Sequence, residues 1–141
     1  MGLDQFIYAK TSDWRNYFKD FLKGTKYEGK RLQEMNFEGA YFRKNNAIHK
    51  YFVDNIQDGE DDCEEYYITK KDLKDLLKII SGVLSKNLKP EENLPNQSGF
   101  FYGSIEYGEH YFDNLKDAKN QIEDILKKYD DDFDFYYSSS W

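Results

Sequence analysis

The clearest pattern of hydrophobic and polar positions lies in the second half of the chain, where two segments have the spacing of amphipathic helices. In the first segment, apolar residues recur at intervals of three and four, at Leu73, Leu76, Leu77, Ile80 and Leu84. Thr69 followed by Asp72 has the form of a capping box, which predicts where this helix begins. The second segment has one apolar face and ends before three aspartates, with Leu115, Ala118, Ile122, Ile125 and Leu126 on that face.

Aromatic and β-branched runs between polar residues predict four short strands, at residues 5–9, 66–68, 99–103 and 134–137. The segment 32–42 is ambiguous, and a strand around residues 36–41 is one interpretation of it. Ser12 or Asp13 can cap another helix, which carries apolar residues as far as Leu22 and closes at Gly24. A short polar helix is expected to place Tyr41, Asn45, Ile48 and Phe52 on one stripe, with Arg43 and Asn46 toward water or a cleft. The order of elements predicts one α+β domain over residues 1–141, with three to four helices packed on a largely antiparallel sheet.

Composition changes this picture little. The 141 residues are enough for one core. Aromatic residues make up 18% of the chain, and their large rings supply much of the apolar area that such a core buries. The single cysteine, Cys63, excludes an intramolecular disulfide, and no apolar run approaches the roughly 18 residues of a membrane span. The N-terminus shows no basic and apolar regions of a secretory signal.

The charge is concentrated in one place. The formal net charge is −7, and six acidic residues lie between positions 58 and 65, where there is no Lys or Arg: Asp58, Glu60, Asp61, Asp62, Glu64 and Glu65. Such a chain is not expected to bind nucleic acid directly, because affinity for a phosphate backbone comes from Lys and Arg. The acidic segment is suited to a basic protein surface, including one that normally holds nucleic acid.

The candidate polar site joins Asn46 and His49 to the turn that contains Asp61, Asp62 and Cys63. A histidine beside a carboxylate or a thiol can supply acid-base chemistry near neutral pH. The favoured interpretation is that Asn46 and His49 hydrogen-bond the acidic turn and orient the helix. Cys63 is expected to be buried and inert, because flanking carboxylates disfavour its thiolate. No ligand spacing typical of a metal site is present, so neither a metal nor another cofactor is expected.

A second candidate site is aromatic. Tyr102, Tyr107 and Tyr111, with His110, Trp14, Tyr137 and Trp141, could line a pocket in which a base or sugar stacks, provided that an arginine such as Arg43 lies near enough to hold a phosphate. The simpler interpretation is that the segment 99–103 is a core strand.

Several segments together resemble one family: Gly2-Leu3-Asp4, the Arg43-x-x-Asn46-x-Ile48-His49 motif, the Asp61-Asp62-Cys63 turn, Gly99-Phe100-Phe101-Tyr102-Gly103, and the end from Phe135 to Trp141. The chain resembles small proteins encoded by bacterial phages and prophages. The resemblance spans most of the chain. It implies an accessory role in the cytoplasm of a bacterial host and no particular activity.

Three classes of function therefore stay open. The preferred one is a non-enzymatic inhibitor that binds a host factor, such as a nuclease with a basic groove, through the acidic surface in the manner of an anti-CRISPR protein. A variant of this class is a sponge that sequesters a nucleotide signal in the aromatic pocket. The second class is a small enzyme that acts on a phosphate ester with His49 and Asp61 or Asp62, and the third is a structural phage component. The lack of a complete catalytic set favours the first.

Overall fold

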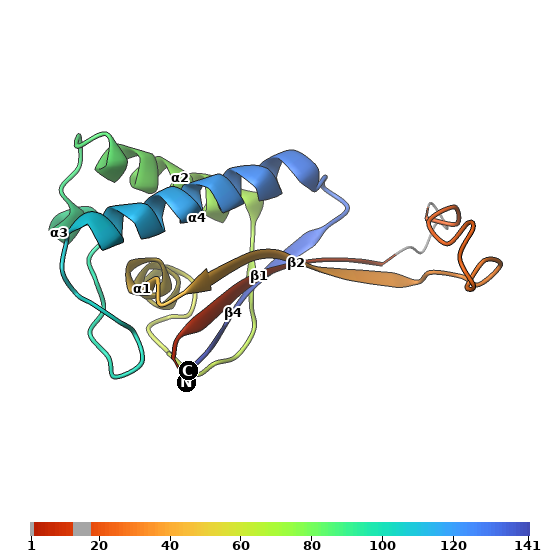
Figure 1. Ribbon diagram of the computed structural model, residues 1–141, viewed down its shortest axis with the longest axis horizontal. Coiled ribbons are helices and arrows are strands. Elements are labelled where there is room, and N and C mark those ends of the chain that lie inside the picture. Colours follow the sequence, from red (N-terminus) through yellow and green to blue (C-terminus); the bar gives the residue numbers. More distant parts are fainter. Residues whose placement is uncertain (1, 13–17) are drawn as a thin grey trace.

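The computed structural model describes residues 2–12 and 18–141, and its centre is a four-stranded antiparallel sheet in the order β2-β1-β4-β3 (Figure 1). The strands are β1 (Asp4–Ser12), β2 (Glu34–Arg43), β3 (Tyr66–Ile68) and β4 (Asp134–Ser140). Both chain ends lie at the same end of the molecule, since β1 and β4 are neighbours that run in opposite directions. The predicted α+β class is confirmed.

Four helices accompany this sheet in the described residues: α1 (Asn46–Asn55), α2 (Lys70–Leu84), α3 (Pro90–Asn93) and α4 (Glu109–Lys128). Helices α2 and α4 lie side by side over one face of the sheet, and α1 covers the end of that face (Figure 1). The predicted apolar stripes face inward, with Leu73, Leu76, Ile80, Leu115, Ala118, Ile122 and Ile125 fully buried. The capping box is present as well: Thr69 Oγ1 accepts from the backbone N–H of Asp72, and the Asp72 carboxylate accepts from the backbone N–H of Thr69.

The covered face of the sheet follows from strict alternation along the central strands. In β1 the buried residues are Gln5, Ile7, Ala9 and Thr11, whereas the residues between them are only half-buried. Tyr137 of β4 is fully buried on the same face and stacks on Phe52 of α1, with 3.9 Å between the ring centroids. This stack joins α1 to the sheet and sets where the polar residues of α1 lie.

The edge strand β2 is protected by a side chain rather than by another strand. The backbone N–H of Tyr41 donates to Gln121 Oε1 at 2.9 Å, and Gln121 Nε2 donates to the Tyr41 carbonyl at 2.8 Å. The amide of Gln121, on α4, therefore takes the place of a neighbouring strand at this position and blocks edge-to-edge pairing there.

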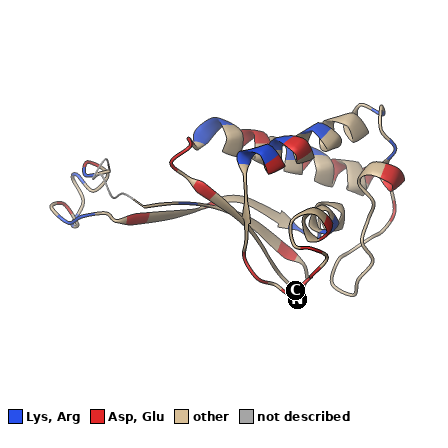
Figure 2. Cartoon of the chain, turned by 180° about the vertical axis from the view of Figure 1, so that it is seen from behind, with Lys and Arg blue, Asp and Glu red and all other residues tan. Residues whose placement is uncertain are grey.

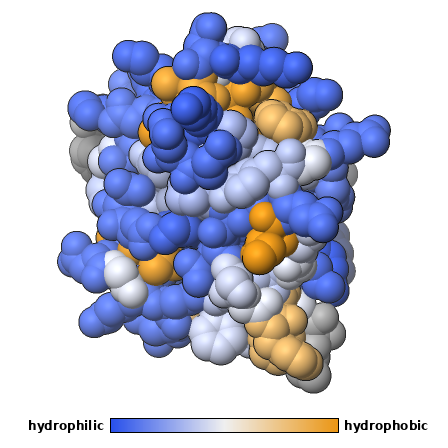
Figure 3. All heavy atoms as spheres, turned by 90° about the vertical axis from the view of Figure 1, so that its left-hand side faces the viewer, coloured by the Kyte–Doolittle hydropathy of each residue, from blue (hydrophilic) through white to orange (hydrophobic). Residues whose placement is uncertain are grey.

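The surface at the end opposite the β1–β2 hairpin is mostly hydrophilic, and its hydrophobic residues form separate patches (Figure 3). That end of the molecule therefore offers no continuous apolar surface for a partner.

The helix predicted between residues 12 and 22 is not formed where the structure describes it. Residues 18–24 form turns, and Phe21 is 61% exposed; residues 13–17, with Trp14, lie outside the described part of the chain. The reason is that the β1–β2 hairpin carries residues 18–24 away from the helical layer, so Phe21 has no face of the sheet or of a helix to pack against.

Two further predictions need correction. The polar helix begins at Asn46, so Tyr41 and Arg43 belong to β2 and not to the helix. The pairing of β2 with β1 continues as far as Arg43, opposite Asp4. Lys44, with a φ of 52°, then turns the chain out of the sheet. Residues 99–103 form a turn instead of a strand: Phe100 is 93% exposed and only the ring of Tyr102 is buried. The Leu3 N–H, just before β1, donates to the Phe101 carbonyl at 2.9 Å, but no ladder continues from this bond in the described residues.

Candidate functional site

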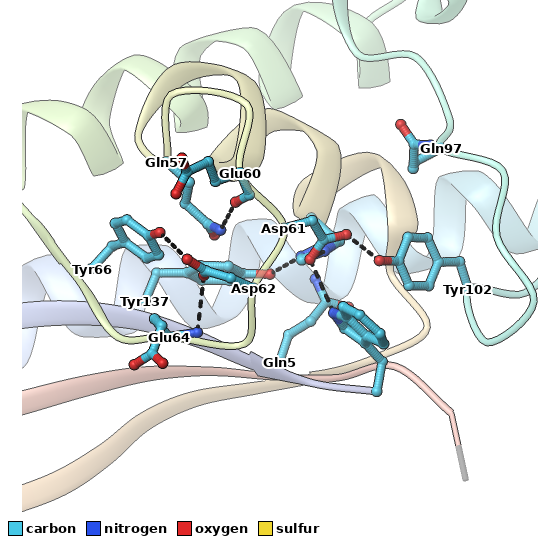
Figure 4. A network of polar contacts seen from close by, with 12 residues as sticks. Gln5, Gln57, Glu60, Asp61, Asp62, Glu64, Tyr66, Gln97, Tyr102 and Tyr137 are labelled. Atoms are coloured by element: carbon cyan, nitrogen blue, oxygen red, sulfur yellow. Dashed lines mark hydrogen bonds and ion pairs between the residues drawn. The ribbon is translucent and has the colours of Figure 1, made fainter.

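The carboxylate of Asp61 is the centre of a polar network in the turn that follows α1 (Figure 4). Asp61 Oδ1 accepts from His49 Nε2 at 2.9 Å and from Trp141 Nε1 at 3.0 Å, and its Oδ2 accepts from the hydroxyl of Tyr102. The three donors come from α1, from the chain end after β4 and from the loop before α4. One carboxylate thus ties together three segments that are far apart in the sequence.

His49 is fully buried, and both of its ring nitrogens are occupied. Its Nδ1 lies 2.7 Å from the hydroxyl of Tyr137, opposite the bond to Asp61. An ionised carboxylate can only accept, so in the neutral ring we assign the proton to Nε2, and Nδ1 accepts from Tyr137. Burial lowers the pKa of His49, although the charge of Asp61 opposes the shift. The ring is therefore a neutral link with no nitrogen free for a substrate.

The negative charge of the network resides on Asp61. Burial by itself would raise the pKa of Asp61, but the hydrogen bonds from Tyr102, His49 and Trp141 outweigh it and hold that pKa below the usual range. Burial and the nearby carboxylate raise the pKa of Tyr102, and burial raises the pKa of Tyr137 well above its ordinary value. The network consequently holds one fixed anion surrounded by neutral donors.

Gln5 supports this network from β1 and was not predicted as a site residue. Its side-chain amide forms two hydrogen bonds with the backbone of Asn45: Nε2 donates to the Asn45 carbonyl at 3.0 Å, and Oε1 accepts from the Asn45 N–H at 2.9 Å. A side-chain hydrogen bond from Gln5 also favours the ionised form of Tyr137. The available signal was a glutamine at an inward position of the alternating strand, followed by Ile7 and Ala9.

The rest of the acidic turn is fixed at further points. Asp62 accepts from the backbone of Glu64 at 3.1 Å and from the hydroxyl of Tyr66 at 2.7 Å, and this carboxylate raises the pKa of Tyr66 to about 12. Glu65 pairs with Lys10 of β1. The turn is therefore held to the sheet on one side and to α1 on the other.

Three acidic residues of the turn point outward. Asp58, Glu60 and Glu64 are exposed, and in the described part of the chain their carboxylates form no ion pair. Asp58 has a φ of 53°, in the left-handed region that few non-glycine residues adopt. Backbone bonds such as Gly59 N–H to the Val53 carbonyl at 2.8 Å maintain this conformation, so the backbone that carries the outward carboxylates is fixed.

Cys63 is exposed, contrary to the prediction that it is buried, and its φ is 58°. The reason is that Asp61 fills the inward position of the turn.

Six acidic residues that the sequence presents as one group thus have different roles, since Asp61 is part of an internal network and Asp62 and Glu65 have partners.

Asn46 contacts a loop rather than the acidic turn. It is buried at the start of α1, where Nδ2 donates to the carbonyls of Tyr102 at 3.0 Å and Ser104 at 2.8 Å, while Oδ1 accepts from the N–H of Gln97 at 3.1 Å. These bonds hold the loop that carries the Tyr102 ring to Asp61. Asn46 therefore positions the network without belonging to it.

The predicted aromatic residues separate into two groups. Tyr102 joins the Asp61 network, whereas Tyr107 and Tyr111 contact each other edge to face, with 5.1 Å between their centroids. The Tyr107 hydroxyl accepts from the Asn96 backbone at 3.1 Å, and the Tyr111 hydroxyl donates to the carbonyl of Leu94 at 2.7 Å. These two rings anchor the loop before α4.

Arg43, which was expected to hold a phosphate beside these rings, pairs instead with Asp4 at 2.8 Å at the end of β2.

Within the described residues, no group of three or more His, Cys, Asp or Glu side chains is placed to hold a metal ion. None of the helices in the described part of the chain is long and apolar enough to cross a membrane.

Comparison with known proteins gives no further assignment: the chain matches no protein-family model, no curated protein and no solved structure.

Proposed function

We propose that the protein is a non-enzymatic binding protein that presents its acidic turn to a basic surface of a partner. The observation that carries the proposal is the arrangement around Asp61, which fixes the turn through three donors and leaves Asp58, Glu60 and Glu64 outward. A preorganised charged surface loses little conformational entropy on binding, so more of its interaction free energy appears as affinity.

The same geometry argues against acid-base catalysis at this place. A general base must come within hydrogen-bonding distance of the proton that it removes. His49 has no exposed surface, and its two nitrogens are already bonded to Asp61 and Tyr137. A substrate could reach a ring nitrogen only if the bond at that nitrogen broke and the buried ring became accessible.

The resemblance to small phage and prophage proteins suggests the kind of partner. Within that context, we propose that the partner is a host protein whose basic surface normally holds nucleic acid, such as a nuclease of a defence system. Several carboxylates on one fixed turn can take the place of successive phosphates on such a surface, because both provide closely spaced negative charge. Binding would then block the nucleic-acid site.

The experiment is affinity capture from a bacterial host with the wild-type protein and with a variant that carries Asp58→Asn, Glu60→Gln and Glu64→Gln. We expect a captured protein that duplex DNA displaces and that the variant fails to retain. The lost charge should lower the association rate and make binding less dependent on salt.

A matched control removes the same charge elsewhere. Glu91, Glu106 and Glu109 are exposed and form no ion pair in the described part of the chain, so their change to Gln alters the net charge equally. Equal retention by the wild-type protein and the turn variant would refute the proposal. Equal loss in both variants would show an effect of net charge alone, which also contradicts it.

A further inference from the structure

The β1–β2 hairpin extends beyond the rest of the sheet. Strand β4 pairs with β1 only as far as Lys10, whereas β2 pairs with β1 as far as Ser12, so the hairpin is two-stranded beyond Lys10 (Figure 1). At its end, residues 18–30, which we name the arm tip, fold into successive turns tied by bonds such as Phe21 N–H to the carbonyl of Phe18 at 3.0 Å. The arm tip has local structure of its own, and almost all of its residues are exposed.

The arm tip is positively charged on an otherwise acidic protein (Figure 2). It contains four lysines, at positions 19, 23, 26 and 30, against Asp20 and Glu28, whereas the whole chain has a net charge of −7. No ion pair in the described part of the chain involves these lysines, and Glu28 accepts from the Gly24 backbone at 3.1 Å. At physiological salt the Debye length is about 8 Å, so carboxylates on the body of the protein repel a ligand at the arm tip only weakly.

Two aromatic rings of the arm tip are also in solvent. Phe21 is 61% exposed and Tyr27 is 54% exposed. Each ring lies between two lysines in the sequence, Phe21 between positions 19 and 23 and Tyr27 between positions 26 and 30. In space, Lys26 Nζ lies 5.1 Å from the centroid of the Tyr27 ring, so a cation and a ring adjoin on the arm tip. A single nucleic-acid strand offers phosphates and unpaired bases to such a combination.

The net charge of the whole chain predicts no direct binding of nucleic acid, but the local charge of the arm tip is positive. We propose that the arm tip binds single-stranded nucleic acid, with its lysines on phosphates and with Phe21 and Tyr27 stacked on unpaired bases. A protein partner fits less well, because the thirteen residues of the arm tip are far fewer than the roughly 20 to 30 that each side of a stable protein interface contributes. Duplex DNA fits less well because its bases are already stacked on one another and offer the rings no free face. The surface is distinct from the acidic turn, so this inference does not depend on the function proposed above.

The test is fluorescence anisotropy with labelled 20-nucleotide oligo(dT), oligo(U) and a 20-base-pair DNA duplex. We expect both single strands to bind more tightly than the duplex, and comparison of the two distinguishes DNA from RNA as the preferred ligand. Four phosphate contacts on a single strand predict a slope of about −2.8 for log affinity against log salt, which is roughly 50-fold weaker binding at 200 mM than at 50 mM.

Two variants separate the two kinds of contact. Lys19→Gln, Lys23→Gln, Lys26→Gln and Lys30→Gln together should abolish both the binding and its salt dependence. Phe21→Ala with Tyr27→Ala should weaken binding by about tenfold or more and leave the slope unchanged, because stacking does not release counterions. Far-UV circular dichroism checks that both variants stay folded, as expected for substitutions in exposed turns.

A control variant changes four exposed lysines on the body that form no ion pair in the described residues, Lys74, Lys78, Lys86 and Lys127. It should bind the single strands as the wild-type protein does. The inference is overturned if no oligonucleotide binds at 50 mM salt, if the control loses as much affinity as the arm-tip variant, or if the duplex binds as tightly as the single strands and the ring variant binds normally. Binding of poly-glutamate as tight as that of oligo(dT) would also overturn it and assign the arm tip to an acidic protein.

Discussion

Replacing His49 with Phe should destabilise the protein by about 3 kcal/mol, because the change removes two hydrogen bonds at once from a fully buried position. The bond to Asp61 is to a charged acceptor, and we take about 1.5 kcal/mol for it, at the low end of the range for such bonds, since Asp61 is 27% exposed. The second loss leaves the hydroxyl of Tyr137 buried without its acceptor, which costs roughly 1 to 3 kcal/mol.

Urea denaturation at pH 7.5 and 25 °C, followed by far-UV circular dichroism, measures this loss. With a slope of about 2 kcal/mol per molar urea, the midpoint should fall by roughly 1.5 M. A total stability of about 5 to 15 kcal/mol leaves the variant folded in buffer. Its acidic turn should be less well fixed, and capture of the proposed partner should weaken accordingly.

The matched control is a double-mutant cycle with Tyr137→Phe. That change alone leaves Nδ1 of His49 without a donor, whereas the two changes together remove both members of the buried pair. The double variant should therefore be less destabilised than the sum of the single variants, by at least about 1 kcal/mol. A loss below about 0.5 kcal/mol in His49→Phe, or a cycle with strictly additive losses, would refute the assigned network.

Stability should also fall as the pH is lowered from about 7: burial lowers the pKa of His49 in the folded state, so the unfolded chain, with a pKa of about 6.5, takes up a proton first. Because the pKa of Asp61 is lowered too, a further loss should follow below about pH 4, and urea titrations at successive pH values should show the first loss in the wild type but not in His49→Phe. Asn46→Ala should lower the free energy of unfolding by about 2 kcal/mol, because the change leaves the N–H of Gln97 and two carbonyls unpaired. Hydrogen exchange should become faster in residues 97–104 and stay unchanged in α4. Thr69→Ala should lower the free energy of unfolding by about 1 kcal/mol in the same urea assay, and Thr69→Asp should restore most of it, because the change removes and then replaces the cap of α2.

The elements that the sequence determined are those whose signal is local. The repeat of Leu73, Leu76 and Ile80 fits only one face of a helix, and Thr69 with Asp72 completes a cap within four residues. The strands at positions 5 and 134 likewise lie inside the observed β1 and β4, because alternation requires no knowledge of the partner. Concentration of acidic residues at positions 58–65 and the bond of His49 to that turn were also predictable.

Tertiary structure decided the rest, because the remaining features depend on which segments meet. Phe21 has a helical spacing with its neighbours but lies at the end of a hairpin, where no second surface buries it. Tyr102 lies in an aromatic run typical of a strand, yet the described residues form no strand ladder there, and its hydroxyl donates to Asp61. Burial of His49 follows from the stack of Phe52 on Tyr137, which are 85 residues apart in the chain. The sequence by itself thus determined α2, α4, the strands β1, β3 and β4, and the position of the acidic turn, because their signals are local. Only the packing of distant segments decided which acidic residue turns inward and which lysines lie at the end of the hairpin.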